Sequence, residues 1–122
     1  MKHNEQRLAG VWVDHKNAFI IAKDAGQFAV KERIDAPGGF EAESEHHRNN
    51  AKQADLLSYF KSLSGHLQHY DQILLFGTGI AQEQLNNFLK EDAKFKDVTI
   101  TIENTGHLTD PQMLAKVRTF FN

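Results

Sequence analysis

Three apolar runs with the character of β-strands follow one another over residues 8–34, separated by only two or three residues. The first two, LAGVWVD at 8–14 and NAFIIAK at 17–23, are nearly continuous in apolar residues, which is typical of strands covered on both faces. The third, QFAVKERI at 27–34, alternates in a way typical of a half-exposed edge strand. Its predicted inward residues are Phe28, Val30 and Ile34, opposite Lys31 and Arg33. Connections this short predict antiparallel hairpins.

The hydrophobic period changes after residue 53, where helical patterns begin to alternate with short apolar runs. Apolar residues at helical spacing predict three helices, and the runs between them predict strands at 72–77 and 97–103. The helical stripes are Leu56, Leu57, Phe60, Leu63 and Leu67; Ile80, Leu85, Phe88 and Leu89; and Met113, Leu114, Val117, Phe120 and Phe121. Thr109 and Gln112 can form a capping box, so the last helix is predicted to begin there.

The order of these elements is β-β-β-α-β-α-β-α, which leaves few architectures open. It predicts an α/β fold, a mixed five-stranded sheet with three helices packed on it, in one domain over residues 1–122. Right-handed crossovers make strand order 3-2-1-4-5 the simplest arrangement, as in the ribonuclease-H-like fold. Chain ends fray unless they dock, so Phe120 and Phe121 are predicted to pack against the sheet. Their expected contacts are Ile100 and Ile102.

The composition excludes several classes of protein. Hydrophobic residues make up 40% of the 122 residues, which indicates a globular chain and not a disordered one. A formal net charge of −2 disfavours extensive wrapping of bare nucleic acid. The absence of cysteine removes disulfides and thiolate chemistry and fits a reducing compartment. No signal-peptide pattern and no apolar run of about 20 residues is present, so we expect a cytoplasmic protein with no membrane contact and no cofactor.

Three segments of the sequence carry a family resemblance. They are GVWVDHKNAFII near the start, ILLFGTGIAQEQLNNFL in the middle and TIENTGHLTDPQMLAKVRTFF at the end. In order and spacing over residues 8–121, they resemble the small bacterial relatives of the central domain of eukaryotic and archaeal peptide-chain release factors. Pelota-type rescue factors share that domain. The resemblance implies a component of the translation machinery whose partner is the ribosome or RNA.

In the release factors, the long loop after the third strand carries a Gly-Gly-Gln tripeptide that enters the ribosomal peptidyl-transferase centre. The equivalent place here holds Pro37, Gly38, Gly39 and Phe40. Phenylalanine cannot position a water molecule as the family's glutamine does, so the resemblance implies a protein that does not release peptides by that chemistry. In this respect the chain is nearer to Pelota, whose central domain also lacks the tripeptide. The glycine pair has a second interpretation, as an ordinary turn.

A long polar segment at 34–53 separates the third strand from the first predicted helix, with Phe40 the one large apolar residue in its interior. Connections in compact domains are usually much shorter, and long ones are functional or disordered. We therefore expect a mobile loop that binds a partner through Pro37, Gly38, Gly39, Phe40, His46 and His47. Its histidines and glutamates are metal-ligand types, but adjacent histidines point apart, so a solvated loop is the favoured interpretation.

Three carboxylates give an alternative function. Asp14 ends the central strand, Glu103 ends the fifth strand, and Asp110 opens the last helix. Magnesium prefers carboxylates that leave positions open for water and phosphate, as a ribonuclease-H-like nuclease requires. The competing interpretation, that Asp14 shapes a turn with His15, is favoured because a two-metal site needs several converging carboxylates.

Two glycine-containing turns are predicted at the same edge of the sheet. They are Gly77-Thr78-Gly79, after the fourth strand, and Thr105-Gly106-His107, after the fifth. Ligands of open α/β sheets usually bind at the carboxyl ends of the strands, and helix N-termini attract anions. The two turns therefore form a candidate ligand pocket, although a tight strand-to-helix connection is the favoured interpretation of the first turn.

The leading prediction is a non-catalytic, translation-associated binding module, as the resemblance implies, with the ribosome or RNA as its partner. The runner-up is a metal-dependent nuclease that uses Asp14, Glu103 and Asp110. A third interpretation is a homodimer in which the edge strand at 27–34 pairs across a twofold axis.

Overall fold

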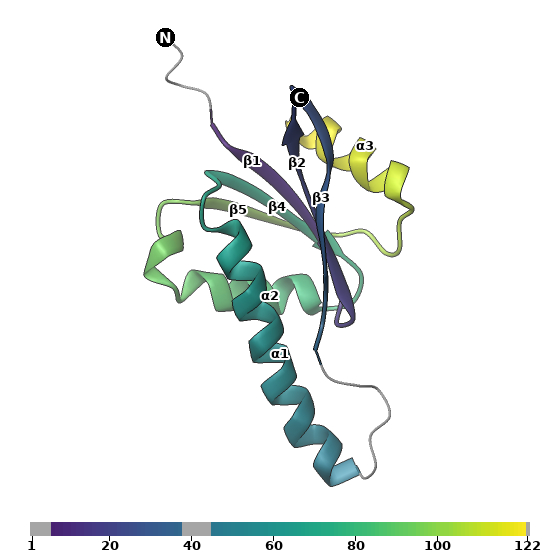
Figure 1. The fold of residues 1–122 in the computed structure, drawn as a ribbon, viewed down its shortest axis with the longest axis vertical. Coiled ribbons are helices and arrows are strands. Elements are labelled where there is room, and N and C mark those ends of the chain that lie inside the picture. Colours follow the sequence, from purple (N-terminus) through teal and green to yellow (C-terminus); the bar gives the residue numbers. More distant parts are fainter. Residues whose placement is uncertain (1–5, 38–44, 122) are drawn as a thin grey trace.

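The computed structural model describes residues 6–37 and 45–121, with the side chains of the first helix described from Asp55 onward. Helices cover both faces of a five-stranded sheet (Figure 1). The strands are β1 (Leu8–Val13), β2 (Asn17–Asp24), β3 (Gln27–Asp35), β4 (Gln72–Gly77) and β5 (Thr99–Asn104). The helices are α1 (Glu45–Leu67), α2 (Ala81–Lys90) and α3 (Asp110–Phe121), with a short 3-10 helix η2 (Ala93–Phe95) before β5.

The strand order in the sheet is β3-β2-β1-β4-β5, as the sequence predicts. β1 lies at the centre, antiparallel to β2 and parallel to β4, so that Val11 lies beside both Ile20 and Leu75. β4 pairs in parallel with β5. β1 and β4 are nearly continuous in apolar residues because both strands have helices on each face. The edges of the sheet are β3 and β5.

One face of the sheet packs against α1 and α2. Alternate strand residues such as Val11 and Leu75 join a core with buried helical residues. The helical residues are Tyr59, Phe60, Leu63 and Leu67 of α1 and Ala81, Leu85 and Leu89 of α2. Two predicted core residues, Leu57 and Ile80, are instead 53% exposed. Leu57 lies about 100° around the helix from Leu56, and Ile80 is the N-cap residue that precedes α2.

α3 covers the opposite face, over β1 and β3. Its Met113 and Val117 form a buried cluster with strand residues that include Trp12 and Phe76. The predicted packing of the last helix over Ile100 and Ile102 is therefore wrong. Ile100 packs with the α1–α2 core on one face of the sheet, but the chain crosses to the other face after β5, so α3 does not meet it. The apolar stripe of a helix shows that it is buried but does not show which face of a sheet it meets.

The start of α3 agrees with the predicted capping box. The N–H of Thr109 donates to Oε1 of Gln112 at 2.9 Å, and the N–H of Gln112 donates to Oγ1 of Thr109 at 3.3 Å. The two residues thereby satisfy backbone donors that have no partner inside a helix.

A β-bulge divides the edge strand β3. The register between β2 and β3 shifts at Lys31, which is the extra residue between Val30 and Glu32. A shift of one residue reverses the faces of all side chains that follow. Phe28 and Val30 therefore pack toward α3, whereas Ile34 packs with the α1–α2 core. The prediction that these three residues share one face is wrong because of the bulge.

α1 begins at Glu45, inside the predicted loop at 34–53, so that prediction is wrong for residues 45–53. This part of the helix reads EHHRNNAKQ, in which no hydrophobic period marks a helix. Figure 1 shows that it extends beyond the end of the sheet. Although α1 has 23 residues, it is too polar to cross a membrane, and no other described helix could do so.

Candidate functional site

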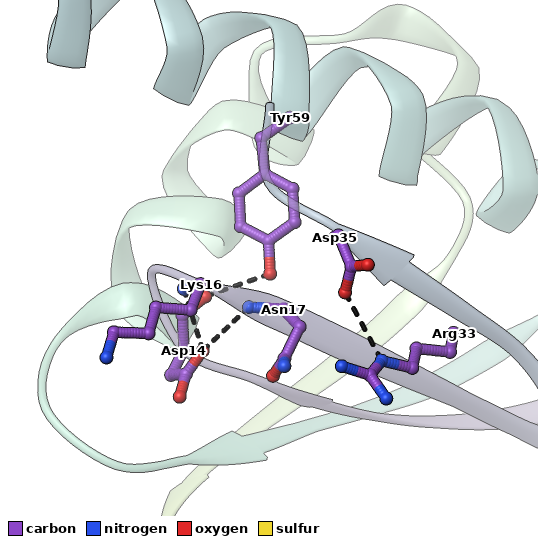
Figure 2. Close-up of polar contacts among 6 residues, drawn as sticks. All are labelled: Asp14, Lys16, Asn17, Arg33, Asp35 and Tyr59. Atoms are coloured by element: carbon purple, nitrogen blue, oxygen red, sulfur yellow. Dashed lines mark hydrogen bonds and ion pairs between the residues drawn. The ribbon is translucent and has the colours of Figure 1, made fainter. Parts of the chain in front are cut away.

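The turn between β1 and β2 lies beside the end of β3 and the middle of α1 (Figure 2). Oδ1 of Asp14 accepts hydrogen bonds from the backbone N–H groups of Lys16 and Asn17, both at 2.8 Å. The N–H of Asp14 donates to the carbonyl oxygen of Asn17 at 3.0 Å. An aspartate that binds the backbone two and three residues later stabilises a tight turn. This geometry agrees with the interpretation of Asp14 as a turn-forming residue.

Tyr59 attaches α1 to this turn. Its side chain is completely buried, and its hydroxyl donates a hydrogen bond to the carbonyl oxygen of Asp14 at 2.9 Å (Figure 2). Burial raises the pKa of the Tyr59 hydroxyl far above its ordinary value, and the negative charges of Asp14 and Asp35 raise it further. The hydroxyl therefore stays protonated and remains a hydrogen-bond donor at physiological pH.

The same turn holds the end of β3. The N–H of Ala36, directly after the strand, donates to the carbonyl oxygen of Lys16 at 2.8 Å. One residue earlier, Asp35 accepts a hydrogen bond from Nε of Arg33 at 3.2 Å. The turn at 14–17 thus binds both the strand that leads into the β3–α1 connection and the helix that follows it. We call this turn, Ala36 and Tyr59 together the arm root.

The part of α1 that precedes the arm root projects from the body of the protein. Glu45 is 14 positions before Tyr59, a length of about 21 Å along an α-helix. Figure 1 shows this part of the helix lying beyond the sheet. We call residues 45–54 the arm helix. Two predicted binding residues, His46 and His47, lie in its first turn and not in a loop.

The remaining predicted binding residues surround the start of the connection. Pro37 is exposed directly after the arm root. Gly38, Gly39 and Phe40 lie outside the described residues, as do residues 41–44 of the segment predicted to be mobile. Of the predicted binding residues, Pro37 therefore lies next to the arm root, and His46 and His47 lie in the arm helix.

The carboxylates of the nuclease alternative are engaged separately. Asp14 stabilises the turn of the arm root, and Glu103 forms an ion pair with Lys116 of α3. Asp110 is exposed at the start of α3. Among the described side chains, no three His, Cys, Asp or Glu residues lie together as a metal site requires. The geometry therefore gives the nuclease alternative no support, and it stays a prediction from sequence.

The two glycine-containing turns lie together at the carboxyl end of the parallel strands. The carbonyl oxygen of Gly77 accepts the N–H groups of Thr105 and Gly106, at 2.7 and 3.2 Å. Nδ2 of Asn104 donates to the carbonyl oxygen of Gly79 at 3.2 Å. Two of the amides that would bind an anion at this site are therefore occupied by the neighbouring turn.

Trp12 of β1 supports the second of these turns. Its Nε1 donates to the carbonyl oxygen of Gly106 at 3.1 Å, and its ring centroid lies 5.8 Å from that of His107. Thr78, in the first turn, is half-buried. The positive φ values of Gly79 and Gly106, 76° and 82°, give a structural reason for these two glycines, and the ligand pocket stays a prediction.

Two buried amides on α2 are absent from the residues that the sequence singled out. Gln82 is completely buried and Asn86 is 8% exposed. Both polar atoms of the Gln82 side chain, and Oδ1 of Asn86, have no hydrogen-bond partner among the described residues. Each lies three positions before a core leucine, Leu85 or Leu89. Polar residues within the apolar stripe are the sequence signal that could have revealed them.

Comparison with known proteins depends on the fold, because the sequence matches no family model and no curated protein. The structure is similar to Pelota from Archaeoglobus fulgidus, with a TM-score of 0.65 and 9% identity, over 95% of this chain and 32% of that one. It is also similar to the archaeal translation termination factor aRF1, with a TM-score of 0.63 and 12% identity, over 91% of this chain and 33% of that one.

A third solved structure is Dom34 of S. cerevisiae, a translation termination-like factor that is involved in RNA quality control and interacts with Hbs1. It matches with a TM-score of 0.54 and 11% identity, over 93% of this chain and 31% of that one. The chain therefore spans about a third of the length of each of these structures. At these identities the likeness establishes the fold: this chain has the fold of a segment of Pelota and release-factor proteins.

Proposed function

We propose that this protein is a non-catalytic binding module of the translation apparatus, which contacts the ribosome through the arm helix and the connection before it. The observation that carries the proposal is the arm root. One turn binds both β3 and α1, so the projection between them starts from a fixed base. In the release factors that the sequence resembles, the loop after the third strand is the part that enters the ribosome.

The shared fold supports the same role. The solved structures with this fold include a translation termination factor and a factor of an RNA quality-control pathway. The sequence of the arm helix, EHHRNNAKQA, carries two fixed cations, Arg48 and Lys52, one carboxylate, Glu45, and two histidines. Cationic residues can bind the phosphate backbone of ribosomal RNA, and phosphate contacts supply a large share of the affinity of protein–nucleic acid complexes.

Sedimentation with purified ribosomes through a sucrose cushion tests the proposal. We expect the wild-type protein to sediment with ribosomal particles and to be released as the salt concentration rises. The double variant Arg48→Glu/Lys52→Glu reverses two charges on the arm helix and is expected to lower ribosome binding at least about tenfold. The control is Lys61→Glu/Arg118→Glu, which makes the same change in net charge at two exposed cations of α1 and α3, outside the arm helix and the arm root.

Two outcomes would contradict the proposal in different ways. Wild-type protein that stays in the supernatant at every salt concentration would remove the ribosome as a partner. Equal binding of the arm variant and the control would keep the ribosome and remove the arm helix as the contact.

The non-catalytic part of the proposal has its own test. The sequence resemblance implies that Phe40 takes the place of the release factors' glutamine, so we expect only background release of peptide when this protein is added to ribosomes stalled at a stop codon. Release stimulated in proportion to the protein added would show that a different residue supplies the chemistry.

A further inference from the structure

The two edges of the sheet are protected to different degrees. β3 contains the bulge at Lys31 followed by Glu32 and Arg33, and bulges and charges of this kind prevent pairing with another strand. β5 has the sequence TITIEN, pairs with β4 in an unbroken register and contains neither lysine nor proline. Its outer side has no partner strand among the described residues. β5 is therefore the edge open to strand addition.

A groove follows this open edge between β5 and α2. Its apolar floor consists of Val98, Ile100 and Ile102, all half-buried. The side chains of α2 form its wall, and Asn86 lines both the end next to Val98 and the end next to Asn104. Asn86 therefore marks the middle of the groove.

The charges along the groove are ordered by the direction of α2. Lys90 and Lys96 line the end where β5 begins, and Glu83 lines the end where β5 finishes. Glu83 and Lys90 are exposed and lie two turns apart on the helix. Between them, Oδ1 of Asn86 is buried without a hydrogen-bond partner among the described residues. The groove thus has an acidic end, an unsatisfied amide at its centre and a basic end.

We propose that a second copy of this chain occupies this groove. In the dimer, the β5 strands of the two copies pair antiparallel about a twofold axis, so that the two sheets become one. The axis reverses the charge order of the second copy and places Lys90 of each chain beside Glu83 of the other. It also places the two Asn86 side chains together, so that Nδ2 of each can donate to the unpartnered Oδ1 of the other.

The sequence of β5 fits this pairing in one register. With Thr101 opposite its own counterpart, Ile100 faces Ile102 and Thr99 faces Glu103, so no like charges meet. In the neighbouring register, Ile100 would lie opposite its own counterpart and Glu103 would lie opposite Asp97. That register is less stable because both residues are acidic. A peptide from an unrelated protein could pair with the same edge, but only a second copy brings the reversed order of charges along α2.

This dimer is independent of the proposed function, because its residues lie outside the arm root and the arm helix. It also differs from a dimer through the edge strand at 27–34, where the bulge and the charged residues of β3 oppose pairing. The two dimers make opposite predictions for charge substitutions at the two edges.

Sedimentation velocity over a concentration series, from micromolar to near-millimolar, tests the inference. We expect the wild-type protein to shift from monomer to dimer as its concentration rises. Lys90→Glu and Glu83→Lys each replace two attractive pairs by two repulsive ones, and each is expected to raise the dimer Kd by about tenfold or more. The double variant Glu83→Lys/Lys90→Glu restores the attraction and is expected to return the Kd to within about threefold of the wild-type value.

The matched control is Lys31→Glu, the same chemical change at the other edge, which is expected to leave the Kd unchanged. Hydrogen exchange gives a second measurement: amides on the outer side of Thr99–Asn104 should exchange more slowly as the dimer fraction increases. A protein that stays monomeric at the highest concentration overturns the inference. A dimer whose Kd does not change in the single charge variants of α2 also overturns the inference. So does a dimer whose Kd changes in Lys31→Glu instead.

Discussion

The two faces of the sheet are stabilised in different ways. On the face covered by α1 and α2, the helical leucines Leu63, Leu67 and Leu85 have no exposed surface. On the face covered by α3, Val117 is completely buried, but Phe120 and Phe121 are only half-buried. The ring of Phe121 stacks on Phe28 of the edge strand β3, with centroids 6.0 Å apart.

The difference shows how the fold supports a projection. The arm helix extends beyond the end of the sheet (Figure 1). The second half of α1 must therefore anchor the whole helix, through its buried apolar residues and the hydrogen bond of Tyr59. α3 carries no projection. A capped start, the buried residues Met113 and Val117 and the half-buried Phe121 hold it on the sheet. The α1–α2 face is therefore expected to contribute more to stability than the α3 face.

The largest expected effect separates the two faces directly. Leu63→Ala removes a completely buried side chain from the α1–α2 core and is expected to lower the free energy of unfolding by about 2–5 kcal/mol. Phe121→Ala removes a larger side chain, yet about 1–3 kcal/mol is expected because that side chain is already partly in water. Urea titration of both variants measures the difference. An equal or larger loss for Phe121→Ala would show that the faces do not differ.

A second prediction concerns the closest contact of α3 with the sheet. A Cβ atom on Gly10 of β1 would overlap Cγ2 of Val117, so Gly10→Ala is expected to cost about 1–3 kcal/mol. Val117→Ala removes the obstructing methyl groups, so the double variant is expected to lose less than the sum of the single losses. Gly65→Ala on α1 is the control. It has open space around the new atom and is expected to raise stability by about 0.5–1 kcal/mol.

The sequence predicted the strand order because that order depends on features that a sequence records. Short connections, periods of two and of 3.6, and the near-continuous apolar character of β1 all lie along the chain. The face that α3 meets was not predictable in this way, because the same stripe from Met113 to Phe121 could pack on either side. Ile34 was misplaced for a related reason: one extra residue at Lys31 reverses the alternation, and no residue type marks it.

The candidate site was less accessible to prediction than the fold. Asp14 was identified as a turn residue, but its link to Tyr59 joins positions 45 residues apart and depends on how α1 crosses the sheet. The arm helix is not predictable from hydrophobic periodicity, because Ala51 and Ala54 are the only apolar residues in its sequence, EHHRNNAKQA. Asn86 and Gln82 could have been noticed as polar residues within an apolar stripe, but their missing partners are visible only in three dimensions.

A third prediction compares the starts of the helices on the two faces. Thr109→Ala removes the capping hydroxyl of α3 and is expected to cost about 0.5–2 kcal/mol. α2 begins at Ile80, which makes no side-chain cap, so Ile80→Ser should raise stability by about 0.5–1 kcal/mol. Thermal or urea unfolding of the two variants measures both changes. A loss of stability in Ile80→Ser would mean that the exposed isoleucine has a packing role.

The smallest effect at neutral pH, and the one closest to the proposed function, is at Tyr59. Tyr59→Phe removes the hydroxyl that donates to the carbonyl oxygen of Asp14, and a loss of about 0.5–1.5 kcal/mol is expected near pH 7. Because the ring still fills its place in the core, the loss reports on the attachment of α1 to the arm root. The same variant is expected to weaken ribosome binding without any change in the charge of the arm helix.

The pH dependence of this variant tests the environment of the hydroxyl. The unfolded chain releases the Tyr59 proton near the ordinary pKa of 10.0, whereas burial and two nearby carboxylates raise the pKa in the folded protein. Above about pH 10 the unfolded state therefore binds fewer protons, and wild-type stability falls by up to about 1.4 kcal/mol per pH unit from this group. Tyr59→Phe lacks this decline, so its stability should approach that of the wild type and then exceed it. Thr109→Ala changes no titratable group, so its stability should differ from that of the wild type by a constant amount over this pH range. If the stability of Tyr59→Phe also stayed a constant amount below that of the wild type, the Tyr59 hydroxyl would have to ionise in the folded protein near its ordinary pKa.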